Sequence, residues 1–380
     1  MALDPYALRS NPFSVVPSKT TEIWADRKKF KRDLEESLKF TLRGSQSQII
    51  ACIWGDWGCG KTHAINYFSN EQVLKRIAEE TQIPSGRLLL SIPIIFPPKD
   101  VLASIYLEIV YRNLIPRLKE VLSFVSKQIT PLEREGSLEI KLLNLGIYED
   151  LARVLSHFFD KDGSMMVRRY LSMTASRNDL SELGIAKGIE TDSEKFLVLG
   201  DLLNTFTRTL YLRIFIWIDD CERIEEVPGK DMYEFQHFLR DTLELVPEKL
   251  TFVTSFTKFP GDEITERMKY LGPAVMQRIS KVIEVDYVTR EEYFDYVEEI
   301  LSYYRKPLKG KTISKYFPFE EKCINDVFDI ITRGKEPLQP RTINRVLSSL
   351  LENALRDGVV PIDDKYLGRV RDQIQLVISS

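Results

Sequence analysis

Continuous apolar runs recur along the chain, and stretches with helical spacing separate them. Residues 48–54, QIIACIW, form one such run, and residues 212–218, LRIFIWI, form another. Runs of this length are too short to cross a membrane, which needs about 20 apolar residues. They are typical of strands that are buried on both faces of a parallel sheet. The pattern therefore predicts an α/β fold in which helices flank a parallel sheet.

Five segments make up the predicted sheet, which should therefore have five strands. They are residues 48–54, 87–96, 212–218, 249–259 and the segment that directly follows Arg278. The stretch after the first run, residues 61–80, is interpreted as a helix because its apolar residues recur at helical spacing. These apolar residues are Ala64, Ile65, Phe68 and Val73.

Two other parts of the chain are predicted to be helical. Many more residues separate Lys61 from Asp219 than one strand and one helix require, so residues 130–192 are interpreted as a helical insertion. Before it, a helix should be interrupted at Pro116, because proline lacks a backbone N–H and cannot continue the helical hydrogen bonding. Apolar positions with a period of 3.6 in residues 340–355 predict a helix of a small helical lid.

Composition and charge narrow the choice of function. The 380 residues include 53 Lys and Arg and 56 Asp and Glu, a net charge of -3. This balance argues against a protein that coats nucleic acid with its whole surface, although a local basic patch remains open. The four cysteines form no C-x-x-C pair, which favours free thiols in a reducing compartment. Since the N-terminal residues also lack the pattern of a secretion signal, we expect a cytoplasmic protein that does not bind membranes.

The segment WGDWGCGKTH, after the first strand, has the G-x-x-x-x-G-K-T spacing of a P-loop. Glycines let the backbone N–H groups approach phosphate oxygens, and the helix N-terminus that follows favours anions. Lys61 should reach the β- and γ-phosphates, and the hydroxyl of Thr62 should hold Mg²⁺. We therefore expect ATP and Mg²⁺ as cofactors. The predicted nucleotide-binding residues are Gly55, Asp56, Trp57, Gly58, Cys59, Gly60, Lys61, Thr62 and His63.

A pair of acidic residues, Asp219 and Asp220, ends the strand at residues 212–218. In parallel sheets, ligands bind at the carboxyl ends of the strands. Asp219 should therefore hold Mg²⁺ together with Thr62. Asp220 should orient or deprotonate the attacking water, with Glu222 as a fallback for that role.

These two motifs and three further ones resemble the AAA+ family of P-loop ATPases. The family's sensor-1 residue is polar and ends a strand, and Thr254 and Ser255 match its place. The arginine that reaches the phosphates of a neighbouring subunit matches Arg278, for which an ordinary salt bridge is an equal alternative. The sensor-2 arginine of the lid matches Arg341, with Arg345 as the rival one turn later. The resemblance implies an ATPase that assembles into a ring or a filament of identical subunits.

The N-terminal lead-in, with NPF at residues 11–13, is similar to the origin-recognition, transposon target-selection and ExeA-like secretion branch of the family. In that branch the lead-in packs on the adenine, so Val15, Val16 and Trp24 are candidates for the base pocket. The acidic pair is also similar to that of the STAND and KAP groups, and the LSELGI segment resembles ATPases of anti-phage defence.

The resemblance divides the chain into an α/β nucleotide-binding domain at residues 1–287 and a helical lid with a C-terminal tail at residues 288–380. Only about 20 residues follow the lid helix, too few for a winged-helix domain. Basic and aromatic residues alternate in SYYRKPLKGKTISKYF, residues 302–317, a mixture that suits nucleic acid.

We therefore predict an ATP-hydrolysing protein that acts on or with duplex DNA in replication, transposition or defence, and that recruits or regulates a protein partner. The alternative is a nucleotide-controlled switch that binds a protein effector without nucleic acid.

Overall fold

The computed structural model describes residues 3–14, 23–82, 88–127, 137–259, 261–307, 314–333 and 338–379. The chain divides into two compact units that are discontinuous in sequence. The first unit comprises Met1–Leu34, Trp54–Asn70 and Ile283–Ser380, and the second comprises Glu35–Ile53 and Glu71–Val282. The predicted domain boundary between residues 287 and 288 remains a prediction.

A sheet with the strand order β2-β3-β4-β1-β5 forms the centre of the second unit, apart from the last residues of β1 and β5. The pairs β2–β3 and β3–β4 are parallel. Among the described residues this sheet has five strands, as predicted. Their bounds are Gln48–Gly55 for β1, Leu88–Ile95 for β2, Tyr211–Asp219 for β3, Leu250–Thr257 for β4 and Ile279–Val285 for β5.

Burial along the strands explains the apolar runs. Every residue of β4 is buried, and so is nearly all of β3, because both strands have a strand on each side and layers on both faces. Strand β2 lies at an edge and exposes Leu88, Pro93 and Ile95. Proline is tolerated at such an edge, where no neighbouring strand requires its missing N–H.

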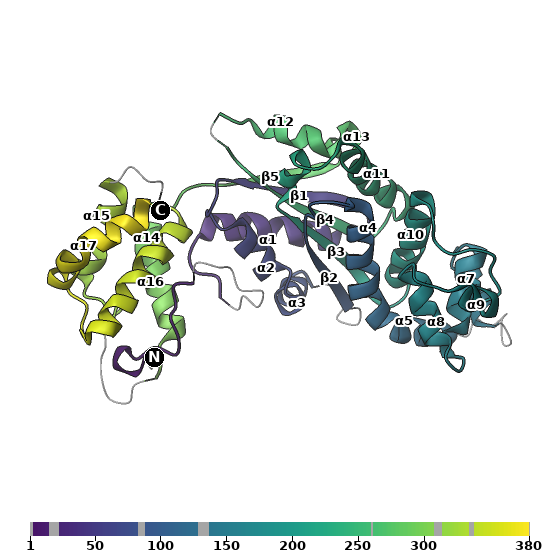
Figure 1. Cartoon of the computed structure of the whole chain (residues 1–380), viewed down its shortest axis with the longest axis horizontal. Coiled ribbons are helices and arrows are strands. Elements are labelled where there is room, and N and C mark those ends of the chain that lie inside the picture. Colours follow the sequence, from purple (N-terminus) through teal and green to yellow (C-terminus); the bar gives the residue numbers. More distant parts are fainter. Residues whose placement is uncertain are drawn as a thin grey trace. The chain divides into compact units, whose positions relative to one another are not determined.

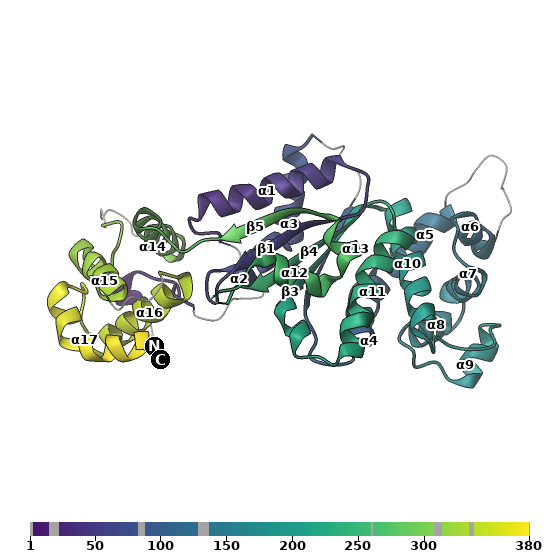
Figure 2. The same ribbon diagram turned by 90° about the horizontal axis from the view of Figure 1, so that it is seen from above.

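Helices lie on both sides of the sheet. Figure 2 shows α4, α10 and α11 on one side and α1 on the other. Within the described residues, no helix combines the length and the apolar character that a membrane crossing requires. The bounds of the long helices are Lys28–Arg43 for α1, Asp192–Arg208 for α10 and Gly229–Leu245 for α11; the short ones are Ile264–Met268 for α12 and Pro273–Met276 for α13.

The predicted helix at residues 61–80 is two helices, α2 at Lys61–Phe68 and α3 at Glu71–Glu80. The prediction of one continuous helix was therefore wrong. The N–H of Ser69 still bonds to the carbonyl of Ile65, but the chain then turns, and α3 begins a new amphipathic face that buries Leu74 and Ile77. Periodicity alone cannot detect a break of two residues when both helices keep an apolar stripe.

The helix around Pro116 is interrupted, as predicted, but the irregular part comes before the proline. It consists of α4 at Val101–Leu107, a π-helical segment at Glu108–Leu114 and α5 at Ile115–Lys127. Pro116 is the second residue of α5, where its missing N–H costs little. The wider π-helical turn accommodates the change in hydrogen bonding that the proline imposes.

Residues 137–192, the described part of the predicted insertion, form short helices joined by loops, as expected. A buried hydrogen bond anchors the insertion to the rest of the second unit. The hydroxyl of Tyr106 on α4 donates to the carbonyl of Leu171, at a distance of 3.0 Å. The helices are α6 at Leu138–Asn144, α7 at Glu149–Ser156, α8 at Gly163–Leu171 and α9 at Arg177–Glu182 (Figure 1).

The lid contains four helices in its described residues, and the predicted C-terminal tail is one of them. Their bounds are Arg290–Tyr304 for α14, Glu321–Arg333 for α15, Pro340–Asp357 for α16 and Asp364–Ser379 for α17. The described part of the predicted tail is therefore largely helical. Helix α17 packs on α15 and α16 because four apolar residues recur on one face. These buried residues are Tyr366, Leu367, Val370 and Ile374.

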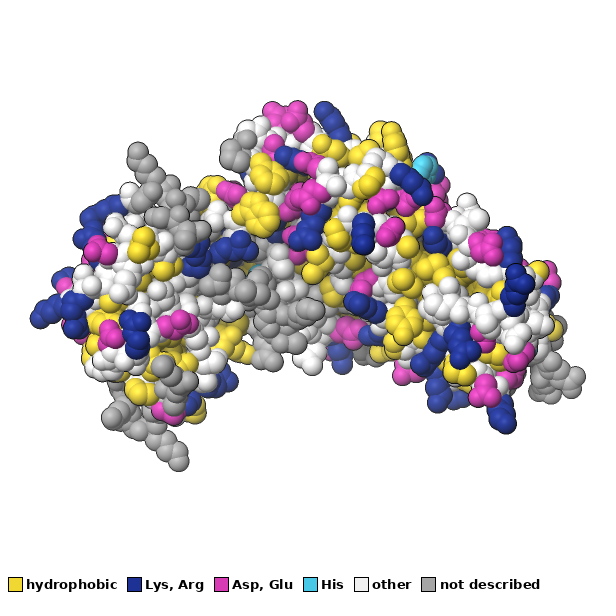
Figure 3. Space-filling view, viewed as in Figure 1, with side chains coloured by type: hydrophobic (Ala, Val, Ile, Leu, Met, Phe, Trp, Pro, Cys, Tyr) yellow, Lys and Arg dark blue, Asp and Glu magenta, His cyan; other side chains and the backbone are white. Residues whose placement is uncertain are grey.

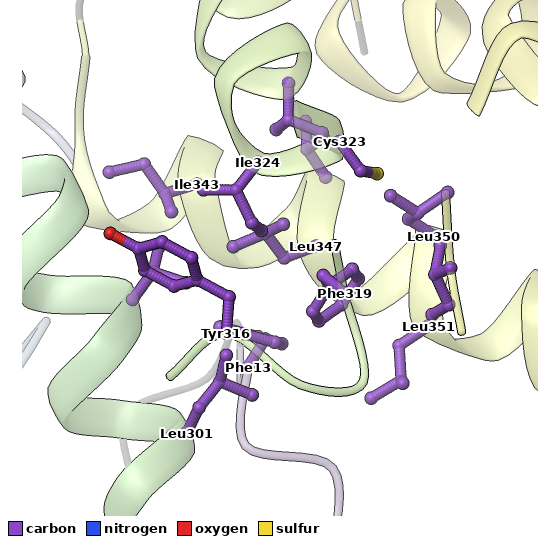
Figure 4. Close-up of a cluster of buried hydrophobic side chains, with 14 of the residues drawn as sticks. Phe13, Leu301, Tyr316, Phe319, Cys323, Ile324, Ile343, Leu347, Leu350 and Leu351 are labelled. Carbon is purple, nitrogen blue, oxygen red and sulfur yellow. The ribbon is translucent and has the colours of Figure 1, made fainter. Parts of the chain in front are cut away.

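The lid core also takes side chains from the N-terminus, which the sequence did not predict. Tyr6, Leu8 and Phe13 are buried among residues of α14 to α17. Figure 4 shows Phe13 beside Tyr316 and Phe319 within this cluster, and the rings of Phe13 and Phe319 meet edge to face at 6.0 Å. The N-terminal residues are thus part of the lid of the first unit.

Candidate nucleotide-binding and catalytic residues

The P-loop lies in the first unit, between the end of β1 at Gly55 and the start of α2 at Lys61. Gly58 and Gly60 have φ angles of 75° and 107°. These values belong to the left-handed region, which glycine adopts without the steric cost of a side chain. The turn they form leads directly into the first turn of α2, whose N–H groups have no acceptor within the helix and can bind an anion.

The carbonyl oxygens of the loop are engaged by donors of the protein. The ammonium group of Lys61 donates to the carbonyls of Gly55, at 2.8 Å, and Asp56, at 3.0 Å. The guanidinium of Arg27 donates to the carbonyl of Cys59 at 3.3 Å. The backbone N–H of Arg341 donates to the carbonyl of Gly58 at 3.3 Å. These bonds leave the loop with a set of cations around it, which favours an anionic ligand.

Close packing requires glycine at position 58 as well. A Cβ atom on Gly58 would lie 2.9 Å from the Cβ of Arg341 and 2.9 Å from the Oε1 of Gln339. The start of the lid helix α16 therefore lies directly on the P-loop, within the first unit. This contact favours Arg341 over Arg345 as the lid arginine, since Arg345 instead donates to the carbonyl of Val377 on α17.

Asp56 connects the loop to the linker between β5 and α14. Its Oδ1 accepts from the N–H of Trp57 at 2.7 Å, and its Oδ2 accepts from the hydroxyl of Tyr287 at 2.6 Å. This second bond raises the pKa of Tyr287 to about 12. Trp57 itself is 51% exposed, and the Cζ of Arg341 lies 5.9 Å from the centre of its ring.

His63, one residue after Thr62, lies under an aromatic cluster. Its ring is 5.6 Å from that of Trp24, which also contacts Tyr67 and Phe68. Burial lowers the pKa of His63 to about 4, and a hydrogen bond with the backbone of Ile23 opposes the shift. Trp24 is thus packed on α2. The other two base-pocket candidates, Val15 and Val16, lie outside the described residues.

Sequence reasoning did not identify two residues of this region, Arg27 and Tyr287. Arg27 is buried, has a positive φ angle of 52° and also donates to the carbonyl of Asp286. A signal was present in the sequence, since Arg27 is a cation placed directly before α1. Its importance depends on contacts with residues 59 and 286, which no local pattern reveals.

The acidic residues lie in the second unit, at the end of β3, and they contact residues of the neighbouring strand β4. Asp219 is 4% exposed, and its Oδ1 accepts a hydrogen bond from the hydroxyl of Ser255. The same Ser255 hydroxyl accepts from the N–H of Asp220 at 3.1 Å. Of the two sensor-1 candidates, Ser255 therefore contacts the acidic pair. Thr254 is buried beside Cys52, whose pKa burial raises to about 12.

The two acids that follow Asp219 have different surroundings. Asp220 has a φ angle of 57°, is about a quarter exposed, and pairs with Arg223 at 3.1 Å. Glu222 is buried, and its carboxylate accepts from both the N–H and the hydroxyl of Thr257, the last residue of β4. Glu222 therefore makes a structural contact with Thr257, whereas the side chain of Asp220 is partly exposed to solvent.

Arg278 lies between α13 and β5, on the surface of the second unit. Its guanidinium donates to the Oε1 of Glu244 at 3.3 Å and to the carbonyl of Arg240 at 3.4 Å. The side chain is 38% exposed, and that of Glu244 is 53% exposed. An exposed pair of this kind contributes little to stability. The arginine is consequently available for exchange with another partner.

Comparison with solved structures agrees with this architecture. The ORC1 protein of Aeropyrum pernix, solved in complex with DNA, is similar with a TM-score of 0.50 and 15% identity, over 97% of this chain and 70% of that chain. The ORC2 protein of Aeropyrum pernix, in its ADP form, is similar with a TM-score of 0.55 and 12% identity, over 98% of this chain and 73% of that chain.

No family model and no curated protein sequence matches the chain. At identities of 15% and 12%, the similarity concerns the fold. The chain has the fold of the AAA+ P-loop ATPases. The fold class and the resemblance that the sequence predicted are thereby confirmed.

Proposed function

We propose that the protein binds ATP and hydrolyses it with Mg²⁺. The observation that carries this proposal is the contact between Arg341 and Gly58, because it places a lid cation on the loop that would hold the phosphates. In this proposal Lys61 and the N–H groups of Gly55 to Thr62 bind the phosphates, and Arg341 contacts the γ-phosphate. His63 supports the loop from the first turn of α2.

We propose Thr62 and Asp219 as the protein ligands of Mg²⁺, which prefers oxygen ligands and keeps several waters. Thr62 supplies a hydroxyl and Asp219 a carboxylate that Ser255 holds in place. When bound, the ion neutralises charge that develops on the phosphate oxygens. Asp220 orients the attacking water and accepts its proton, and Ser255 or Thr254 acts as the sensor-1 residue.

Self-association follows from the role proposed for Arg278. In a ring or filament of identical subunits, Arg278 would leave its exposed pair with Glu244 and stabilise the phosphoryl group in a neighbouring subunit. Such arginine fingers contribute about 10³–10⁵-fold to turnover. The intrachain pair would cost little to break, since exposed ion pairs contribute roughly 0–1 kcal/mol.

We further propose that the protein is cytoplasmic, acts with duplex DNA and recruits or regulates a protein partner. One observation favours the alternative, a switch without nucleic acid. Several cations of residues 302–317 are engaged within the first unit: Arg305 donates to the carbonyl of Lys315, Lys306 pairs with Asp4, and Lys315 pairs with Glu298. Two further lysines of this stretch lie outside the described residues, namely Lys309 and Lys311.

The distribution of charge on the face drawn in Figure 3 is mixed, with Lys and Arg side chains interspersed among Asp and Glu. DNA binding therefore requires a direct measurement. ATP turnover would be measured with and without duplex DNA. The affinity for duplex DNA would be measured at several salt concentrations. Stimulated turnover, with an affinity that falls as salt rises, is the expected result. If neither binding nor stimulation occurs at low salt, the switch becomes the better proposal.

The shared active site is tested by mixing two inactive variants. Lys61→Ala should bind no nucleotide but still supply Arg278, whereas Arg278→Ala should bind ATP but hydrolyse it poorly. If Arg278 acts on a neighbour, the mixture should recover part of the turnover that each variant lacks alone. Arg240→Ala, on the same surface, is the matched control and should keep normal turnover. Normal turnover of Arg278→Ala would overturn the proposal.

A further inference from the structure

Trp57 lies in the middle of the P-loop, and this large aromatic residue is half exposed there. The exposed ring is not isolated. The guanidinium of Arg341 lies 5.9 Å from its centre, within the range of a cation–π contact. The stem of Arg341 passes over Gly58, where a Cβ atom would meet the Cβ and Cδ of the arginine at 2.9 Å and 3.4 Å. Trp57 and Gly58 therefore guide the arginine together.

The position of Trp57 is itself held by a short row of hydrogen bonds. Its N–H donates to Asp56, and the other oxygen of Asp56 accepts from Tyr287. The residue after Tyr287, Val288, donates its N–H to the carbonyl of Leu338 at 2.8 Å, two residues before α16 begins. The linker before the lid and the start of the sensor-2 helix are thus tied to each other and to the loop.

A long arginine side chain has many rotamers in water, and ordering it on a ligand lowers affinity. An aromatic face beside the guanidinium restricts these rotamers before the ligand arrives. A planar guanidinium suits such stacking better than an ammonium group does. Because Arg341 starts on the loop that would hold the phosphates, this restriction acts where a terminal phosphate would be recognised.

We propose that Trp57 is a positioning residue that presents Arg341 to the γ-phosphate, and that Tyr287 and Asp56 hold Trp57 in place for this purpose. The proposal rests on the proposed function, since it requires Arg341 to contact the γ-phosphate. In this proposal the protein discriminates between ATP and ADP through four residues, namely Tyr287, Asp56, Trp57 and Arg341.

The test compares the affinity for a non-hydrolysable ATP analogue with the affinity for ADP, by isothermal titration calorimetry. Trp57→Leu keeps an apolar side chain but removes the aromatic ring. Trp57→Phe keeps an aromatic ring. Trp57→Leu should weaken binding of the ATP analogue about two- to fivefold, the worth of an exposed cation–π contact, and leave ADP binding unchanged. Trp57→Phe should retain most of the preference, and Tyr287→Phe should shift it in the direction of Trp57→Leu by a smaller factor.

A purely structural role predicts a different result. If Trp57 only maintained the fold of the loop, Trp57→Leu would lower the affinities for the ATP analogue and for ADP by the same factor. This result would overturn the proposal. The proposal is also overturned if Trp57→Leu leaves the ratio of ATP to ADP affinity as it is in the wild type. It is overturned as well if Trp57→Leu and Trp57→Phe change this ratio by the same factor. Melting temperatures of the variants establish that each is folded.

Arg341→Ala separates this inference from the proposed function. If Arg341→Ala leaves the ratio of ATP to ADP affinity unchanged, the sensor role of Arg341 is wrong, and the proposed function loses that contact. If Arg341→Ala reduces the ratio and Trp57→Leu does not, only the positioning role of Trp57 is wrong. A reduced ratio in both, with no further loss in the double variant, supports the inference.

Discussion

Two regions of the molecule differ in the hydrogen bonds that hold them. The phosphate-loop region lies in the first unit and consists of Arg27, Gly55–Thr62, Tyr287 and Arg341. The acidic region lies in the second unit and consists of Asp219–Glu222, Ser255 and Thr257. In the phosphate-loop region, cationic and N–H donors bind backbone carbonyls. In the acidic region, carboxylates accept from the hydroxyls and an N–H of the neighbouring strand. Donors therefore surround the loop in one region, and carboxylates gather in the other.

The two regions also differ in how far their parts are separated along the chain. Ser255 reaches Asp219 across 36 positions, from the strand next to it in the sheet. Arg27 bonds to Asp286 across 259 positions, and Tyr287 bonds to Asp56 across 231. The acidic region therefore follows from strand pairing alone, whereas the phosphate-loop region exists only when the N-terminus, the loop and the lid have all come together.

The largest expected effect separates binding from turnover. Lys61→Ala, in the phosphate-loop region, should abolish nucleotide binding because it removes the cation that bonds to the loop carbonyls and is proposed to bind the phosphates. Asp220→Asn, in the acidic region, should bind ATP normally but lower kcat by about 10²–10⁴-fold, the usual contribution of a general base. Equilibrium binding of ATP and steady-state turnover, measured for both variants, check this division.

Glu222→Gln is the matched control for Asp220→Asn. It changes an acid two residues away that is already bonded to Thr257, so it should alter stability more than kcat. A binding defect in Asp220→Asn, or an equal loss of kcat in Glu222→Gln, would contradict this division, in which the phosphate-loop region binds the nucleotide and Asp220 supports its hydrolysis.

Each unit also contains a buried arginine whose described partners are backbone or hydroxyl oxygens. Arg213, on β3, is 1% exposed and bonds to the carbonyls of Gly44, at 2.6 Å, and Gln46, at 3.2 Å, and to the hydroxyl of Thr251 at 2.9 Å. Burial lowers its pKa to about 10. Arg213→Met keeps the apolar stem but leaves these acceptors unpaired, so it should reduce the free energy of unfolding by about 3 kcal/mol.

Urea denaturation of Arg213→Met and of Arg112→Met measures this effect. Arg112 pairs with Glu108 on the same helical stretch, and its side chain is 71% exposed, so its loss should cost less than about 0.5 kcal/mol. Equal losses in the two variants would show that the second unit does not depend on its buried cation.

The sequence predicted the parts of the fold whose signals are local. The P-loop spacing and the apolar strands before Asp219 and Ser255 each lie within about ten residues, and all were located correctly. Arg27, Tyr287 and the packing of Tyr6 and Phe13 in the lid core were not predicted, because their roles depend on partners hundreds of residues away. The break after Phe68 was missed for another reason, since two short amphipathic helices produce the pattern of one.

The smallest expected effect concerns pH and the phosphate-loop region. The pKa of His63 is lowered to about 4 by burial, from an ordinary value of about 6.5. Between these values the unfolded chain binds a proton at this position that the folded protein does not bind. Stability is therefore present above pH 6.5 and is lost as the pH falls towards 4. By pH 5 the loss should reach about 2 kcal/mol.

His63→Gln removes this titration, so urea denaturation at pH 7 and pH 5 should show a smaller loss of stability in the variant than in the wild type. The difference between the two losses, and not the stability at either pH, isolates His63, because Asp and Glu residues elsewhere titrate equally in both proteins. The same loss in both would mean that His63 is protonated in the folded protein. The ring of Trp24 would then lie against a cation, and the aromatic cluster over α2 would stabilise a charge next to the P-loop.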